Sequence, residues 1–160
     1  MRHRFIVQIP LGAVAIKDIE FDLTSRHELV PILMALQHLY VHCKDTLDII
    51  LGLIDADMCT AENPSLGCIG MCHWENLVLA SLRLGCNLDY DQLADLATNH
   101  RKIRQLLGLS GWDDKLYRRS TIQENLNQLA PDTLQAGRDH LLCLFGHTYP
   151  AHLQTTRVEH

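Results

Sequence analysis

Apolar residues recur at helical spacing through most of the chain. Between positions 29 and 40, leucines, isoleucine and tyrosine fall on one face of a helix. The same spacing predicts a second helix over about 45–58, a third over 74–84, a fourth over about 88–97 and a short fifth over 101–107. We therefore expect a mainly α-helical protein built as a helical bundle.

Residues 4–23 follow a different pattern. Val14 and Ile16, and then Ile19 and Phe21, alternate with polar or small neighbours, which is typical of extended chain. The sequence Pro10-Leu11-Gly12 predicts a turn between two short strands. The N-terminal segment is therefore expected to be extended.

Capping and breaking residues mark the boundaries of the first two helices. Ser25-Arg26-His27-Glu28 has the form of a capping box. Pro31 would clash inside a helix, so either a separate turn precedes a helix that begins near Pro31, or the helix is kinked there. The break at 42–45 is short, and two consecutive helices with a short connection predict an antiparallel pair.

The C-terminal part also carries capping signals. Thr121-Ile122-Gln123-Glu124 has the form of a capping box and predicts a short helix that ends before Pro131. Asp132 is placed to cap a last helix through Phe145. From Gly146 onward no periodicity is evident.

These signals divide the chain into five parts. An extended segment (1–23) leads into a helical pair (24–58) and a linker rich in proline, glycine and small residues (59–70). Three short helices joined by tight turns outline a helix-turn-helix-like unit within 71–136. A C-terminal helix and tail (137–160) complete the chain.

Composition is ordinary for a globular protein. The 160 residues are 47% hydrophobic and 21% charged, with a formal net charge of −5. No apolar run reaches the roughly 18 residues of a membrane helix, and the apolar part of the N-terminus, ending at Pro10, is short for a signal peptide. We expect a cytoplasmic protein whose six cysteines are reduced.

Positive charge is concentrated in one block. Residues 1–98 carry a net charge of −7 and residues 120–160 a net charge of −2, whereas residues 99–119 carry +4. The last helix of a helix-turn-helix unit can lie in the major groove of DNA. We therefore name as candidate contacts to double-stranded DNA the polar and basic side chains of this block: Asn99, Arg101, Lys102, Arg104, Gln105, Lys115, Arg118 and Arg119.

Each candidate has a role that fits its chemistry. Arg101, Lys102 and Arg104 can bind phosphates or guanine edges, and Asn99 and Gln105 can recognise adenine. The basic pair after Tyr117 and the preceding lysine would add phosphate contacts. The alternative is that a short basic helix is simply a solvated surface, and a motif match alone does not decide between the two.

Metal ligation is a weaker possibility. Cys59, Cys68, Cys72 and His73 have the ligand types of a zinc site, but their spacing lacks paired C-x2-C, and adjacent ligands point poorly at one ion. A second candidate pair, at helical i, i+4 spacing, is His38 and His42, and a third group is Asp55, Asp57 and Glu62. Buried thiols, satisfied or exposed histidines and a solvated helix end explain these residues more simply, so we assign no metal ligand.

Enzymatic motifs are absent from the sequence. It contains no G-x-S-x-G, no P-loop and no G-x-G-x-x-G. Trp74 and Trp112 lack an interleaved aromatic–basic pattern, so we interpret them as core or groove-lining residues and not as base-stacking platforms.

Several blocks, spread over roughly residues 14–136, occur in a recognisable order and spacing. They are Ile16-Lys17-Asp18-Ile19-Glu20-Phe21-Asp22, Ser25-Arg26-His27-Glu28, Leu36-Gln37-His38-Leu39-Tyr40, Gly70-Met71-Cys72-His73-Trp74, Val78 to Gly85, Leu88 to Leu93, His100 to Gly108 and Thr121 to Leu134. These blocks resemble the insertion-sequence transposases of the ISNCY group and the helical N-terminal domain of DDE-type transposases.

The resemblance implies a protein of DNA transposition that binds transposon terminal repeats. In that family, catalysis belongs to a later RNase-H-like domain in which carboxylates hold divalent metals such as Mg²⁺. The sequence departs from the pattern at Gly137, so we expect a truncated transposase with no cofactor of its own, inactive alone, and transfer no catalytic residue. When bound to DNA it would be associated with the nucleoid.

Two further hypotheses remain open. The chain can be a helical interaction module that associates with itself or modulates a full-length transposase through the apolar stripe from Leu29 to Tyr40. It can also be a module stabilised by zinc.

Overall fold

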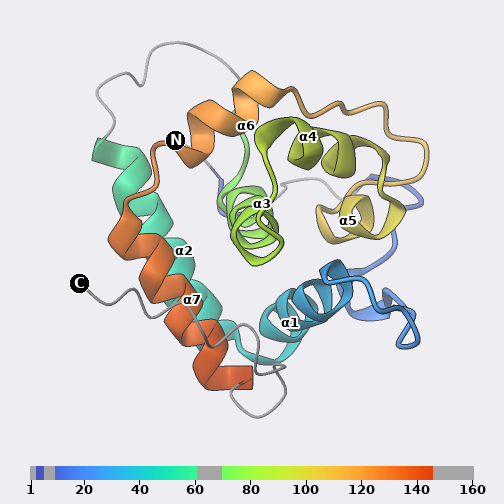
Figure 1. The fold of residues 1–160 in the computed structure, drawn as a ribbon, viewed down its shortest axis with the longest axis horizontal. Helices are drawn as coiled ribbons and strands as arrows, with labels where there is room; N and C mark the ends of the chain where they lie inside the picture. Colours follow the sequence, from blue (N-terminus) through green and yellow to red (C-terminus); the bar gives the residue numbers. More distant parts are fainter. Residues whose placement is uncertain (1–2, 6–9, 61–69, 146–160) are drawn as a thin grey trace.

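The computed structural model describes residues 3–5, 10–60 and 70–145, and within them the protein is a bundle of helices without strands (Figure 1). The mainly α-helical prediction is confirmed. A short 3₁₀ turn, η1 (Ile16–Asp18), precedes seven α-helices. They are α1 (Leu29–His42), α2 (Lys44–Thr60), α3 (His73–Gly85), α4 (Tyr90–Asn99), α5 (Arg101–Leu106), α6 (Arg119–Leu126) and α7 (Pro131–Phe145).

Helix α3 lies at the centre of the bundle, where it contacts α1, α2, α4 and α6 (Figure 1). Every residue from Met71 to Ala80 is buried, although the run includes His73, Glu75 and Asn76. A helix that is buried on all sides has no solvated face for polar side chains, so these polar groups need partners inside the protein. The end of α3 approaches α1 closely, because a Cβ on Gly85 would lie 2.4 Å from Cδ1 of Ile32.

The start of α1 resolves the question raised by Pro31. The helix begins at Leu29, so Pro31 occupies its first turn, where the missing N–H would have no partner in any case. The expected capping box does not form: Glu28 is the N-cap and makes no side-chain cap hydrogen bond. Instead, Nδ1 of His27 accepts a hydrogen bond from the backbone N–H of Leu29 (3.2 Å).

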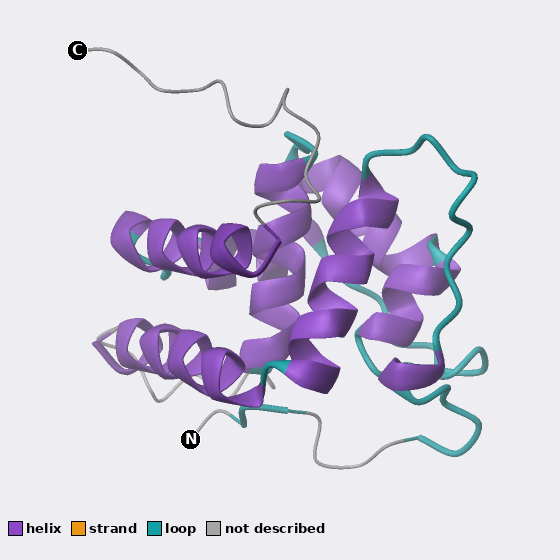
Figure 2. Cartoon of the chain, turned by 90° about the horizontal axis from the view of Figure 1, so that it is seen from below, coloured by secondary structure: helices purple, strands orange, loops and turns teal. Residues whose placement is uncertain are grey.

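The antiparallel partner of α2 is α7, so the expected pairing of the first two helices is wrong. Only Cys43 separates α1 from α2, and one residue is too short to reverse the chain into an antiparallel hairpin. Both views show α2 and α7 side by side at one edge of the molecule (Figures 1 and 2). Near the C-terminal end of α2, Asp57 accepts a hydrogen bond from the N–H of Ala130, just before α7 (2.9 Å).

The extended N-terminal strands are also absent from the described residues. The turn at Pro10 forms, with Gly12 at φ +83° and the N–H of Ala13 bonded to the Pro10 carbonyl (3.0 Å). Of the alternating residues after it, Ile16 begins η1 and Ile19 follows its end, and no strand partner is present among the described residues. The side-chain amide of Gln37 donates to the backbone carbonyls of Ile16 and Ile19 (2.8 Å each). These two bonds satisfy carbonyls that would otherwise be paired by a neighbouring strand.

The three helices of the predicted helix-turn-helix-like unit form close to the expected bounds. Asp89 caps α4 with a complete capping box to Gln92. His100 caps α5, and Gly108 ends that region with φ +79°. Helix α6 begins at Arg119, so Thr121 lies within it and does not cap it.

One hydrophobic core runs through the bundle and includes buried residues from helices α1 to α6. Leu134 of α7 is half-buried and packs against this core. Helix α7 extends on both sides of position 137, where the sequence departs from the transposase pattern. The 59–70 linker lies largely outside the described residues, as does the tail from Gly146.

Candidate nucleic-acid interface

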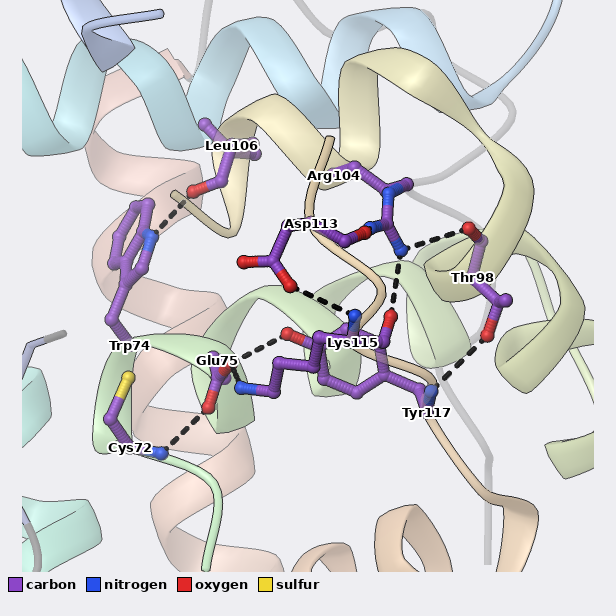
Figure 3. Close-up of polar contacts among 9 residues, drawn as sticks. All are labelled: Cys72, Trp74, Glu75, Thr98, Arg104, Leu106, Asp113, Lys115 and Tyr117. Carbon is purple, nitrogen blue, oxygen red and sulfur yellow. Dashed lines mark hydrogen bonds and ion pairs between the residues drawn. The ribbon is translucent and has the colours of Figure 1, made fainter. Parts of the chain in front are cut away.

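Arg104 is turned into the protein. Its guanidinium donates hydrogen bonds to the backbone carbonyls of Thr98 (3.0 Å), Lys115 (2.9 Å) and Asp113 (Figure 3). Thr98 belongs to α4, and the other two acceptors belong to the loop 107–118 that joins α5 to α6. The planar fork of arginine suits several acceptors at once, so Arg104 holds this loop against the end of α4.

Lys115 is the second basic candidate that is used internally. Its ammonium pairs with the carboxylate of Glu75, which is only 2% exposed (Figure 3). The same carboxylate accepts hydrogen bonds from the Tyr117 hydroxyl (2.5 Å) and the backbone N–H of Cys72 (2.9 Å). We call Glu75, Arg104, Lys115 and Tyr117 the loop clasp, because together they fasten the loop to α3 and α4.

The environment around Glu75 keeps the Cys72 thiol and the Tyr117 hydroxyl protonated. Burial, followed by the charge of Glu75, raises the pKa of the Cys72 thiol to about 12. The same two causes raise the pKa of the Tyr117 hydroxyl above its ordinary value. At neutral pH Tyr117 is therefore a hydrogen-bond donor and Cys72 is a thiol, a poor nucleophile and metal ligand. The hydrogen bonds of this cluster therefore serve to hold the loop in place.

The remaining candidates are more exposed. Arg101 and Arg118 are exposed, Lys102 is half-buried, and none of the three forms an ion pair or a side-chain hydrogen bond with a described residue. Arg119 lies 3.6 Å from Asp91, and both side chains are exposed, so this pair is weak.

The side-chain amides of the two base-reading candidates, Asn99 and Gln105, are not both available to a DNA base. The side-chain amide of Asn99 donates to Asp95 (2.7 Å) on the same helix. Gln105 is half-buried, and its Oε1 is buried without a hydrogen-bond partner among the described residues. Both would have to reorient before they could recognise a base edge.

The connections between helices bear on the helix-turn-helix outline. Residues 86–89 connect α3 to α4, and this turn includes Asn87 at φ +51°, whereas His100 alone connects α4 to α5. A helix-turn-helix has a turn of about three or four residues. The length fits α3–α4, yet the basic helix is α5, so the helix-turn-helix assignment itself stays a prediction.

The two tryptophans have opposite environments. Trp74 is in the core, with its indole N–H donating to the Leu106 carbonyl (2.8 Å). Trp112 is 90% exposed, so its interpretation as a core or groove residue is wrong. The turn in which the N–H of Asp113 bonds to the carbonyl of Ser110 places Trp112 at an outer corner.

Among the described candidate metal ligands, Nε2 of His73 lies 3.5 Å from a carboxylate oxygen of Asp55, and no third described candidate joins this pair. Cys72 and His73 are buried at the start of α3, while Cys68, Glu62 and the side chain of Cys59 lie outside the described residues. The rings of His38 and His42 lie 4.9 Å apart on the exposed face of α1. Across 3–5, 10–60 and 70–145, no three histidine, cysteine or acidic side chains are placed to hold a metal ion.

The apolar stripe proposed for protein association is used by the core. Leu29, Ile32, Leu33, Leu36 and Leu39 are each at most 6% exposed. A partner could reach this stripe only by displacing α2 and α3. These five side chains are therefore not available at the surface, and the interaction-module hypothesis itself stays a prediction.

Sequence reasoning missed Glu75 and Tyr117. A signal for Glu75 was present, since it is the one acidic residue in the apolar run from Met71 to Ala80 and lies three residues after its N-cap. A carboxylate in such a run requires a buried partner. The partner, however, comes from a loop 40 residues away, which no local pattern indicates.

The comparisons with known proteins find no match: no family model, no curated protein and no solved structure corresponds to this chain. In the part of the chain that the structure describes, no helix has the length and apolar character to cross a membrane.

Proposed function

We propose that this chain binds double-stranded DNA through outward-facing cations at the starts of α5 and α6. These are Arg101 and Lys102 on α5, and Arg118 and Arg119 at α6. The carrying observation is that Arg101, Arg118 and Arg119 are exposed and Lys102 is half-buried, while the other two basic residues of the block serve the fold.

The position of these four cations supports a role outside folding. The positive end of the helix dipole favours acidic side chains, and neither α5 nor α6 has one in its first turn. Basic groups there slightly disfavour the helices, so folding alone does not explain them. A DNA phosphate would remove this repulsion and add charge-assisted hydrogen bonds.

The resemblance to ISNCY-type transposases suggests the DNA concerned. On that basis the ligand is a transposon terminal repeat, the process is DNA transposition, and the protein works at the nucleoid. Phosphate contacts from the four cations would position the duplex, and Asn99 at the junction of α4 and α5 would be the nearest base-reading side chain.

Binding is tested by fluorescence anisotropy with a labelled duplex of about 30 base pairs across a salt series. Arg101→Ala or Arg118→Ala should weaken binding and lower the salt slope by about 0.9 for each phosphate that the variant no longer neutralises. Arg138→Ala on α7 removes the same charge from an exposed site elsewhere and is the matched control. Equal effects of all three substitutions, or no salt-sensitive binding at about 50 mM salt, would refute the proposal.

Specificity needs a separate measurement. A duplex with the terminal repeat of an ISNCY-type element should compete better than a scrambled duplex of the same length and composition. Equal competition would leave DNA binding in place and reject transposon ends as the target.

A further inference from the structure

A cavity of about 360 Å³ lies between the N-terminal segment and the ends of α1 and α5. Phe5, Tyr40 and Trp74 form an aromatic wall, in which neighbouring rings lie 5.7 Å and 5.0 Å apart. The backbone around residues 13–16 and Gly108 close other sides. This volume is within the range of small-molecule sites, which are mostly apolar with a few placed polar groups.

The walls of the cavity are held in place by contacts of their own. Gln37 fixes the carbonyls of Ile16 and Ile19 at 2.8 Å, and the indole N–H of Trp74 is bonded to Leu106. The N–H of Gly108 is bonded to the carbonyl of Gln105 (3.0 Å). These hydrogen bonds hold the backbone and Trp74 in place before a ligand binds, so a ligand would meet little ordering cost.

Two cations and one hydroxyl supply the polar character of this cavity. Lys17 and Lys44 contribute to its lining, and neither is ion-paired with a described residue. No Asp or Glu is among the described residues that line it. The Tyr40 hydroxyl likewise has no hydrogen-bond partner in the described part of the chain. An apolar space lined by two lysines, neither ion-paired with a described residue, matches a ligand with an apolar body and an anionic head.

We propose that this cavity binds a small apolar monoanion, such as a medium-chain carboxylate. Its hydrocarbon part lies against the aromatic wall, and its carboxylate lies between Lys17 and Lys44 within reach of the Tyr40 hydroxyl. None of these residues belongs to the proposed DNA-binding surface, so the two proposals stand or fall separately.

The experiment uses Trp74 as its reporter. The chain has two tryptophans, and Trp112 is 90% exposed, so Trp112→Phe leaves Trp74 as the only indole at little structural cost. In this background we titrate decanoate, below its micelle concentration, against decan-1-ol as the uncharged match. Decanoate should give a saturable change in Trp74 emission, and the Lys17→Met/Lys44→Met pair should weaken its binding about fivefold or more.

Controls separate recognition from non-specific effects. The pair of methionine substitutions should leave the affinity for decan-1-ol unchanged, and Arg138→Met should leave decanoate binding unchanged. Val41→Phe adds bulk to the lining and should weaken both ligands. The proposal is overturned if decanoate gives no saturable signal, if the lysine substitutions or Val41→Phe leave decanoate binding unchanged, if Arg138→Met weakens it equally, or if the signal accompanies loss of helical circular dichroism.

Discussion

The loop clasp and the outward cations use the same residue types for opposite purposes. Arg104 and Lys115 direct their charge to carbonyls and to a buried carboxylate within the chain. Arg101 and Arg118, a few residues away in sequence, extend into solvent. Net charge counts both groups alike, yet only cations that keep their donors free can attract a phosphate. The local net charge counted from a sequence therefore does not give the charge that a surface presents to a ligand.

The largest expected effect is the loss of stability when the buried carboxylate of the loop clasp is removed. Glu75→Ala leaves the Tyr117 hydroxyl and the Cys72 N–H without their acceptor, and we expect it to lower the free energy of unfolding by about 3 kcal/mol. Lys115 contributes less to this loss because its side chain is 40% exposed and regains water. Urea denaturation measures the change, with exposed Glu124→Ala as the control. A loss below about 1 kcal/mol would show that the clasp does not fasten the loop.

Arg104→Lys tests whether charge or shape matters at the clasp. Lysine keeps the charge but cannot reproduce the fork that reaches three carbonyls, so we expect a loss of about 2 kcal/mol in unfolding free energy. DNA affinity of the folded variant should stay within about twofold of the parent. If the free energy of unfolding stayed unchanged while DNA binding weakened, Arg104 would have to be assigned to DNA contact and not to the loop clasp.

On the outward side, Asp91 is expected to oppose DNA binding. It is exposed on α4 and lies 3.6 Å from the Arg119 guanidinium. Asp91→Asn removes a negative charge and frees that cation, so DNA affinity should rise about twofold to fivefold, with little change in stability. Anisotropy at low salt measures it, and Asp139→Asn on α7 is the matched control. Unchanged affinity would place Asp91 outside the field of the bound duplex, and a fall in affinity would show that its carboxylate supports binding and so contradict the prediction.

The smallest expected effect is the pH dependence of stability that comes from His100, the residue between α4 and α5. Burial, and then the nearby charge of His27, lower the pKa of the His100 imidazole. Its Nδ1 accepts the N–H of Ile103 (3.4 Å) and so caps α5, which a protonated nitrogen cannot do.

Because the folded state binds this proton less readily than the unfolded state, the stabilisation is complete above a pH of about 6.5 and declines as the pH falls below it. Between about pH 7.5 and 5.5 we expect a small loss of unfolding free energy from this group, reduced by solvent screening because the imidazole is only half-buried. His100→Asn caps without titrating, so comparing the two proteins by urea denaturation isolates the effect. Identical pH dependence of both would exclude His100 as its source.

Much of the fold could be predicted because its signals are local. Helical periodicity located the helices within a few residues, whereas the two predicted capping boxes at 25–28 and 121–124 do not cap α1 and α6. Pairing was harder: α7 replaced α1 as the antiparallel neighbour of α2, since the single residue Cys43 prevents a reversal that spacing alone suggested. The candidate site was predicted as one block, and only half of its members remain as outward cations.

The amino-acid sequence by itself determined the helical class, the main helix boundaries and the concentration of positive charge in residues 99–119. Tertiary structure decided which of those charges reach solvent. The physical reason is that Glu75 lies 40 residues from Lys115 in the chain, and a buried carboxylate must be paired wherever its partner comes from. Folding thus assigned Arg104 and Lys115 to the interior contacts and left Arg101, Lys102, Arg118 and Arg119 to face outward.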